Sequence, residues 1–261
     1  MPITLLTAAK RKRKMTITEG IVLKERIVGE QDKFIDILTK EHGLMEISVK
    51  GARKINGKSG SSAQLFAYSR FCVDKRRDRF YLNSAEPIHI FYGLRQSVSR
   101  ISLAGYFAEV LRYSTAELTD SGNVLRLFLN TLHFLEKGTR DEVQLKAIFE
   151  LRLMSETGFM PDIVGCRNCG KYEPQSLYFS VSDGSFCCED CFGDRDSTGC
   201  MKVSLSVLTA VRHIVLADME RIFNFRLSED SMNVLAEFAE SYLISHLERH
   251  FPTLDFYRSV T

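Results

Sequence analysis

Four cysteines, arranged as two short pairs, form the pattern in this chain that is best suited to binding a metal ion. Cys166 and Cys169 make one Cys-x-x-Cys turn, and Cys188 and Cys191 make a second turn after a gap of eighteen residues. Two such turns can surround a divalent ion with four thiolates in a tetrahedron, and zinc is the usual ion at this spacing. Because four sulfur ligands leave no open position for water or substrate, we expect one structural zinc ion rather than a zinc hydrolase.

Other uses of paired cysteines stay open beside zinc. Two disulfide bonds would suit an oxidising compartment, but no apolar signal segment with a cleavage site is visible. A thioredoxin-like pair and an iron-sulfur cluster both fit the spacing less well. Cys187 could compete with Cys188 for the metal, although Cys188 and Cys191 have the regular spacing. Cys72, between Phe71 and Val73, is predicted to be a small core residue.

Before Pro87 the chain is patterned as short strands. Alternation is clear in Phe34-Ile35-Asp36-Ile37, and glycines mark several turns. Five strands in about seventy residues predict a small Greek-key barrel of the OB-fold type over residues 15–87, a fold that commonly binds single-stranded nucleic acids. The expected strands are 20–27, 34–39, 44–50, 65–74 and 79–85.

Positive charge is concentrated in this first part of the chain, although the whole chain has a net charge of only +2. A basic loop rich in glycine and serine follows the third expected strand, and a second basic group surrounds the turn between the fourth and fifth. Lysine and arginine side chains there could displace counterions from a nucleic-acid backbone. The predicted DNA-binding residues are Lys50, Arg53, Lys54, Lys58, Arg70, Lys75, Arg76, Arg77 and Arg79. Residues 1–14, which end in a basic run, are predicted to be a disordered extension.

After residue 87 the apolar period changes to that of helices. Stripes run along 101–111, 124–135, 142–156 and 207–215, and along a last helix from 229 to about 250 that Pro252 follows. In the third stripe, Arg152 lies in phase with Leu145, Ile148, Phe149 and Leu153. The cysteine module, at about 162–200, interrupts the helices. The chain is therefore predicted to be α+β, with a five-stranded barrel followed by a helical domain, 88–261, that carries the inserted zinc module.

No catalytic constellation is visible in the sequence. The basic loop lacks the Gly-x-x-x-x-Gly-Lys-Ser/Thr pattern of nucleotide hydrolases, and no Gly-x-Ser-x-Gly elbow occurs. His246 and His250 stand four residues apart, but near a helix C-terminus they are better explained by the helix dipole than as metal ligands. An NAD-dependent deacylase would need a glycine-rich dinucleotide loop that is not found. No apolar stretch approaches the roughly 20 residues that cross a bilayer, so we expect a cytoplasmic protein. Because no catalytic constellation is visible, we also expect that the protein is not an enzyme.

Several motifs resemble the RecO family of bacterial recombination mediators. The match is most specific in Phe149-Glu150-Leu151-Arg152-Leu153-Met154-Ser155-Glu156-Thr157-Gly158-Phe159-Met160-Pro161 and in the two cysteine turns. It continues in Tyr178-Phe179-Ser180, and the barrel contributes Glu19-Gly20-Ile21-Val22-Leu23, Glu41-His42-Gly43 and Lys50-Gly51-Ala52-Arg53. The likeness covers nearly everything after Met15.

The resemblance implies a non-enzymatic protein of the bacterial cytoplasm and nucleoid that acts in DNA repair and recombination. Such a protein binds single- and double-stranded DNA, anneals complementary strands, and works with RecR, and in some organisms RecF, to help RecA replace single-strand-binding protein. In this family the barrel binds DNA and RecR, and the helical body receives the acidic, apolar C-terminal tail of single-strand-binding protein. A zinc-stabilised nucleic-acid-binding adaptor without annealing activity is the alternative.

Overall fold

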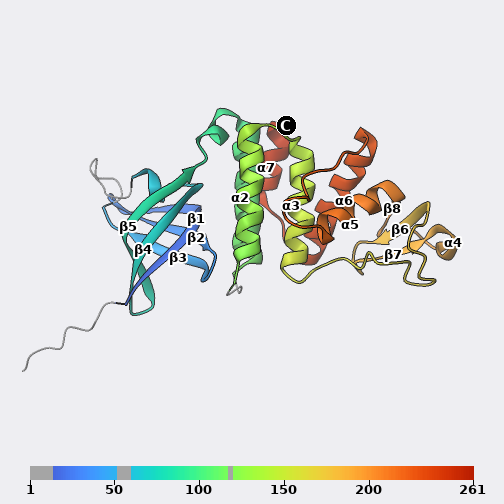
Figure 1. The fold of residues 1–261 in the computed structure, drawn as a ribbon, viewed down its shortest axis with the longest axis horizontal. Helices are drawn as coiled ribbons and strands as arrows, with labels where there is room; N and C mark the ends of the chain where they lie inside the picture. The colour runs from blue at the N-terminus through green and yellow to red at the C-terminus, as the bar shows by residue number, and fades with distance from the viewer. Residues whose placement is uncertain (1–13, 52–59, 117–119) are drawn as a thin grey trace, which may run out of the picture. The chain divides into compact units, whose positions relative to one another are not determined.

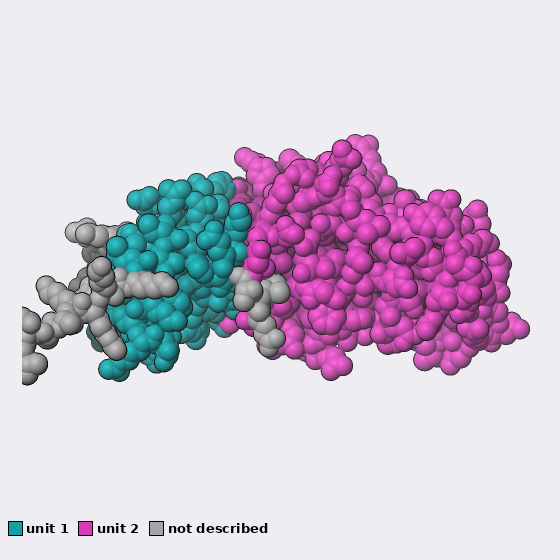
Figure 2. Space-filling model, turned by 60° about the horizontal axis from the view of Figure 1, so that its bottom comes forward, with its two compact units in different colours: residues 1–90 teal, residues 91–261 magenta. Residues whose placement is uncertain are grey.

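The computed structural model describes residues 14–51, 60–116 and 120–261. The chain divides into two compact units, residues 1–90 and 91–261 (Figures 1 and 2). Among the predicted DNA-binding residues, Arg53, Lys54 and Lys58 lie outside the described residues, as does most of the extension 1–14.

The first unit is a closed barrel of five strands, as the sequence predicts. The strands follow the order β1-β2-β3-β5-β4, and β3 pairs with β5 in parallel while the other pairs are antiparallel. This order is that of the OB-fold. The strands are β1 (Lys14–Val28), β2 (Asp32–Thr39), β3 (Gly43–Val49), β4 (Ala67–Arg76) and β5 (Arg79–Ile90), and a short 3-10 helix, η1 (Ser61–Ala63), precedes β4.

The long strand β1 closes the barrel by pairing with two neighbours. Its first half, from Lys14 to Ile21, pairs with β4, and its second half, from Gly20 to Val28, pairs with β2. Gly20 lies where the two pairings overlap, and a Cβ atom there would stand 2.7 Å from the carbonyl oxygen of Leu38. A side chain at this position would therefore force β1 and β2 apart, which explains why a glycine occurs inside the strand.

Alternate residues of the five strands fill the barrel with aliphatic and aromatic side chains. The core includes Val22, Ile35, Ile37, Ile47, Phe71 and Val73, with Phe80 and Leu82 packed against it. Cys72, expected in the core, is only half-buried, because it lies between the inward-facing Phe71 and Val73 and alternation turns it outward. Strand β5 is longer than predicted and continues through Pro87 to Ile90.

The second unit contains the helices, in the order α1 (Val98–Ser114), α2 (Gly122–Lys137), α3 (Glu142–Glu156), α5 (Leu205–Leu216), α6 (Glu229–Leu247) and α7 (Pro252–Val260), with a 3-10 turn, η2 (Tyr92–Gln96), before α1. Helix α3 lies among the others, and it is buried from Gln144 to Leu151. The ring of Phe149 on α3 packs 4.1 Å, centroid to centroid, from that of Phe107 on α1. Helix α3 is therefore buried on all sides over this stretch, although its sequence shows a single apolar stripe.

Short polar signals fix the helix ends. Asp141 accepts hydrogen bonds from the backbone N–H groups of Val143 and Gln144 at the start of α3, and Ser228 accepts one from Ser231 at the start of α6. Gly138 ends α2 in the left-handed conformation with φ of +63°. Pro252, predicted only to follow the last helix, is the first residue of a further helix, α7, where a proline loses no helical hydrogen bond.

The cysteine module is a small sheet with the order β7-β6-β8, formed by β6 (Ser176–Ser180), β7 (Ser185–Cys188) and β8 (Cys200–Ser204), plus the short helix α4 (Glu189–Phe192). The rings of Tyr178 and Phe192 stack in it with their centres 4.0 Å apart.

Among the described residues, none of the helices combines the length and the apolar character that a membrane crossing requires.

Candidate metal centre and nucleic-acid interface

The four cysteines predicted from spacing come together in the second unit. Cys166 and Cys169 lie on the turn before β6, Cys188 ends β7, and Cys191 lies on α4. Their sulfur atoms all lie within 4.8 Å of one another, and the Sγ atoms of Cys169 and Cys188 are 3.7 Å apart. A tetrahedral site with Zn–S bonds of about 2.3 Å needs sulfur atoms separated by about 3.8 Å. The cluster therefore fits a metal ion with four thiolate ligands.

Backbone N–H groups favour the ionised form of Cys166, which a metal ligand requires. Burial alone would raise the pKa of this thiol, but N–H groups, foremost that of Cys188, lower it to about 6. The Cys188 nitrogen lies 3.3 Å from Cys166 Sγ. Gly165 keeps the turn tight, since a Cβ there would stand 2.8 Å from the carbonyl oxygen of Gly170. The turn is thus shaped to present a thiolate.

Cys187 is not among the clustered sulfur ligands, although it adjoins Cys188. Its thiol is buried, and burial raises its pKa. The Asn168 side chain contacts its sulfur at 3.5 Å. The grouping of Cys188 with Cys191 follows the predicted spacing.

Arg212 on α5 fastens the first cysteine turn to the helices. Its guanidinium donates hydrogen bonds to the carbonyl oxygens of Ile163, Val164 and Tyr172 at 2.8, 3.2 and 2.8 Å. Its Cζ atom also lies 3.8 Å from the centre of the Tyr172 ring. These carbonyls flank the turn that carries Cys166 and Cys169 on both sides, so one side chain fixes both ends of the first cysteine turn.

On the barrel, the described basic residues fall into two groups. Lys50, Lys75 and Arg76 surround the aromatic pair Phe80 and Tyr81, with nitrogen or Cζ atoms 5.1 to 5.7 Å from the ring centres. Arg77 and Arg79 flank Asp78 in the same β4–β5 turn and are exposed. Arg70 belongs to a different place on β4, where it pairs with Glu19 at 2.9 Å and faces Glu86 on β5.

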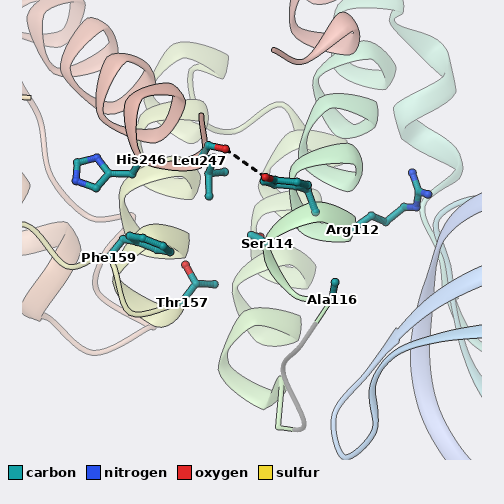
Figure 3. A pocket seen from close by; sticks show the side chains of 8 residues that line it. Arg112, Ser114, Ala116, Thr157, Phe159, His246 and Leu247 are labelled. Carbon is teal, nitrogen blue, oxygen red and sulfur yellow. Dashed lines mark hydrogen bonds between the residues drawn. The ribbon is translucent and has the colours of Figure 1, made fainter. Parts of the chain in front are cut away.

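A groove of about 560 Å³ lies within the second unit (Figure 3). Phe159, Thr157 and Leu247 line one side of it, and Ser114 and Ala116 line the other. We call it the α1–α6 groove. Phe159 is 41% exposed, so part of an aromatic side chain faces solvent there.

Polar and cationic groups surround the α1–α6 groove. The Tyr113 hydroxyl donates to the carbonyl oxygen of Leu247 at 3.3 Å, which ties the end of α1 to the end of α6. The guanidinium of Arg249 lies 4.6 Å from the Tyr113 ring centre, and Arg112 and His246 belong to the lining. The sequence pattern did not indicate this groove, because its walls come from segments that lie far apart along the chain.

Comparisons with known proteins match both units. The family described as Recombination protein O N terminal matches residues 14–91, and the family described as Recombination protein O C terminal matches residues 95–255. The DNA repair protein RecO of Acetivibrio thermocellus is 32% identical over 243 residues, which cover 93% of this chain and 96% of that protein. That of Alkaliphilus metalliredigens is 32% identical over 93% of this chain and 98% of its own length. For that of Bacillus subtilis the identity is 28%, over 87% and 88%.

A closed barrel, a helical unit with a four-cysteine cluster, and matches across both define a recombination protein of the DNA repair class. The chain belongs to the RecO family. The resemblance seen in the sequence motifs is thereby confirmed.

Proposed function

We propose that this protein is a recombination mediator that binds single- and double-stranded DNA and anneals complementary strands. The observation that carries the proposal is the group of cations at one end of the barrel, Lys50, Lys75, Arg76, Arg77 and Arg79. Exposed side chains of this kind release counterions from the phosphate backbone, and this release gives affinity without sequence preference. Arg53, Lys54 and Lys58 continue the basic sequence directly after Lys50, and Arg70 completes the proposed set.

Annealing requires no bond-making residue. Two polyanionic strands must be held close together, with their charge screened and their bases free to pair. A basic surface supplies this by electrostatics alone, so the proposed activity is not enzymatic. Residues 15–87 would form the DNA-binding domain, and 88–261 the helical domain with the metal module at about 162–200.

Zinc is the proposed occupant of the four-cysteine cluster, with Cys166, Cys169, Cys188 and Cys191 as its ligands. Bound there, the ion would cross-link the two cysteine turns and stabilise the module, and it would have no open position for substrate. The ligands are held in place by the turn at Gly165 and by the contacts of Arg212.

The partners proposed from the family are RecR, RecA, in some organisms RecF, and the acidic, apolar tail of single-strand-binding protein. The α1–α6 groove supports a place for that tail. It offers the exposed ring of Phe159 to an apolar side chain, and the exposed Arg249 nearby to a carboxylate. The proposed setting is the bacterial cytoplasm at the nucleoid.

A strand-annealing assay with purified protein tests the proposal. Complementary oligonucleotides coated with single-strand-binding protein should anneal faster with the wild-type protein than without it. The double variant Arg53→Ala/Lys54→Ala should bind DNA more weakly. The slope of the logarithm of its binding constant against the logarithm of salt concentration should be less steep, by about 0.7 to 0.9 for each phosphate that the variant no longer neutralises. Arg167→Ala is the matched control, because Arg167 pairs with Asp183 on the surface of the metal module.

The outcome separates two functions. DNA binding without faster annealing would favour a nucleic-acid-binding adaptor. Failure of the wild-type protein to bind oligonucleotides at low ionic strength would refute both functions, and an unchanged salt dependence in the double variant would refute the role of the loop.

A further inference from the structure

Tyr81 occupies the outer face of the barrel between two neighbouring strands. Phe80 and Leu82 pack against the core, so alternation along β5 turns Tyr81 outward. In the strand register it stands beside Asp74 of β4 and Ser48 of β3. Tyr81 is half-buried and lies on the face formed by β3, β5 and β4.

Two cations from the flanking strands lie over the Tyr81 ring. Lys50, which follows β3, places Nζ 5.7 Å from the ring centre, and Arg76, at the end of β4, places Cζ 5.1 Å from it. Both distances are within the range of cation–π attraction. An aromatic ring between two cations has the composition of a site that stacks a base and binds the adjoining phosphates.

Asp74 fixes the position of Arg76. Its Oδ2 atom lies 3.6 Å from the Arg76 guanidinium, and the Asp74 side chain is 3% exposed. A buried carboxylate is costly to move, so it anchors the arginine beside the ring. Arg76 itself remains about half exposed, at 48%, and can contact a ligand in solution.

Phe34 on β2 offers a direct comparison, because Phe34 and Tyr81 stand on either side of Ser48 of β3 in the strand register. OB-folds commonly bind oligonucleotides over strands 2 and 3. In this protein Phe34 is also half-buried and also lies beside a cation, with Arg26 Cζ 5.8 Å from its ring centre. Arg26, however, is bound to two carboxylates, Asp36 and Glu46. Two carboxylates therefore offset the charge of Arg26, and they would repel a phosphate that approaches Phe34.

We propose that single-stranded DNA crosses this barrel over β3, β5 and β4, with a base stacked on Tyr81 of β5 and not on Phe34 of β2, and with its phosphates on Lys50 and Arg76. The inference rests on the proposed DNA-binding function and assigns that function to one face. It adds a residue, Tyr81, that reads the difference between single and double strands.

The exchange that binding requires is favourable. A phosphate draws Lys50 off the ring, and the uncovered ring then receives a base, while Arg76 stays paired with Asp74 and binds a neighbouring phosphate with its exposed part. The attraction given up is weak at an exposed site, whereas stacking of one base on an aromatic side chain is equivalent to roughly 5- to 150-fold in affinity. In a duplex the bases are already paired and stacked, so only a single strand gains from Tyr81.

Four proteins and three ligands test this assignment. Affinities of the wild-type protein, Tyr81→Ala, Tyr81→Phe and Phe34→Ala are measured for a single-stranded oligonucleotide, for the same backbone without bases, and for a duplex of equal length. We expect Tyr81→Ala to lose roughly 5- to 150-fold in affinity for the normal single strand alone. Tyr81→Phe and Phe34→Ala should retain wild-type affinity for all three ligands.

Retained duplex binding by Tyr81→Ala shows that the variant is folded. An equal loss for all three ligands, or no loss for any, would overturn the stacking role of Tyr81. A selective loss in Phe34→Ala instead would place the stacked base on Phe34 of β2. In each of these cases the wild-type protein still binds DNA, so the proposed function stands; if the wild-type protein binds none of the ligands, the proposed function itself fails.

Discussion

Tyr106 on α1 donates a hydrogen bond of 2.7 Å from its hydroxyl to Oε1 of Glu150 on α3, and neither residue has exposed surface. Lys146, one turn before Glu150, lies 2.9 Å from the same carboxylate and 2.8 Å from Glu240 on α6. Burial raises the pKa of Glu150, and burial lowers that of Lys146 less than its two carboxylate neighbours raise it. A charged network therefore joins three helices inside the second unit.

Lys146→Met should destabilise the protein strongly. The substitution keeps most of the side-chain volume but leaves Glu150 buried without its cation, which costs about 3–5 kcal/mol in comparable cases. Urea unfolding measures the change. The double variant Lys146→Met/Glu150→Leu should recover part of the loss, because no buried charge is left unpaired. A smaller loss in the single variant than in the double would contradict the network.

Glu240 should make stability dependent on pH in the acid range. Burial would raise the pKa of Glu240, but Lys146 and Arg258 hold it below its usual value. Because the folded state binds this proton less readily than the unfolded state, the stabilisation is present above the ordinary glutamate pKa of about 4.3 and is lost as pH falls through the lower folded value. The difference in unfolding free energy between the wild-type protein and Glu240→Gln should therefore shrink on acidification. A constant difference from about pH 6 to about pH 3 would contradict this assignment.

How far the sequence predicts the fold differs between the two units. Strand alternation and turn glycines indicate each barrel strand, since both are local signals. The closure of β1 onto β2 and β4 follows from Gly20 and a shift in register, which no local pattern indicates. The sequence predicts that β5 ends before Pro87, because a proline is typical of a strand boundary. In the structure Pro87 instead pairs with Ser69 at an irregular point of the ladder, where a missing N–H group is tolerated.

The helical unit shows where local patterns are insufficient. Lys146 and Glu150 stand four apart, as in an ordinary surface ion pair, and only packing against α1 and α6 buries them. Arg152, placed in an apolar stripe by its spacing, instead donates to the carbonyl oxygens of Ile214, Val215 and Ala217 at the end of α5. Such contacts depend on tertiary structure.

The two candidate sites also differ in how far the sequence predicts them. The cysteine cluster was predicted completely, because ligand spacing within each turn is a local requirement. On the barrel, the sequence could not choose among the aromatic residues. The choice of Tyr81 over Phe80 needs the strand register, and the choice over Phe34 needs the carboxylates that surround Arg26.

One zinc ion per chain should be found by elemental analysis of the purified protein. Cys188→Ser should lower the metal content and destabilise the module, because three thiolates remain around the ion. Cys187→Ser is the matched control, and it should retain the metal, since Cys187 is not among the clustered ligands. Loss of metal in the control and retention in Cys188→Ser would reverse the assignment.

Arg212→Met should release the bound zinc faster. The substitution leaves three carbonyl oxygens beside the first cysteine turn without their donor, and hydrogen bonds to a charged group contribute about 1.5–3 kcal/mol each. If opening of this turn limits release, a loss of about 1.4 kcal/mol already speeds it tenfold. Transfer of zinc to a coloured chelator measures the rate. Arg167→Ala, which removes a surface ion pair of the same module, should release zinc at the wild-type rate.

Phe159→Ala should weaken binding of the tail of single-strand-binding protein. The Phe159 ring is 41% exposed at the α1–α6 groove, and an aromatic anchor at the centre of an interface commonly contributes about 2 kcal/mol or more, or about thirtyfold in affinity. Titration with a fluorescent peptide of the acidic tail measures the change. Phe256→Ala is the control, because Phe256 on α7 is 56% exposed and does not line the groove. Equal peptide affinity in the wild-type protein and Phe159→Ala would place the tail elsewhere, and a loss confined to Phe256→Ala would point to the surface of α7.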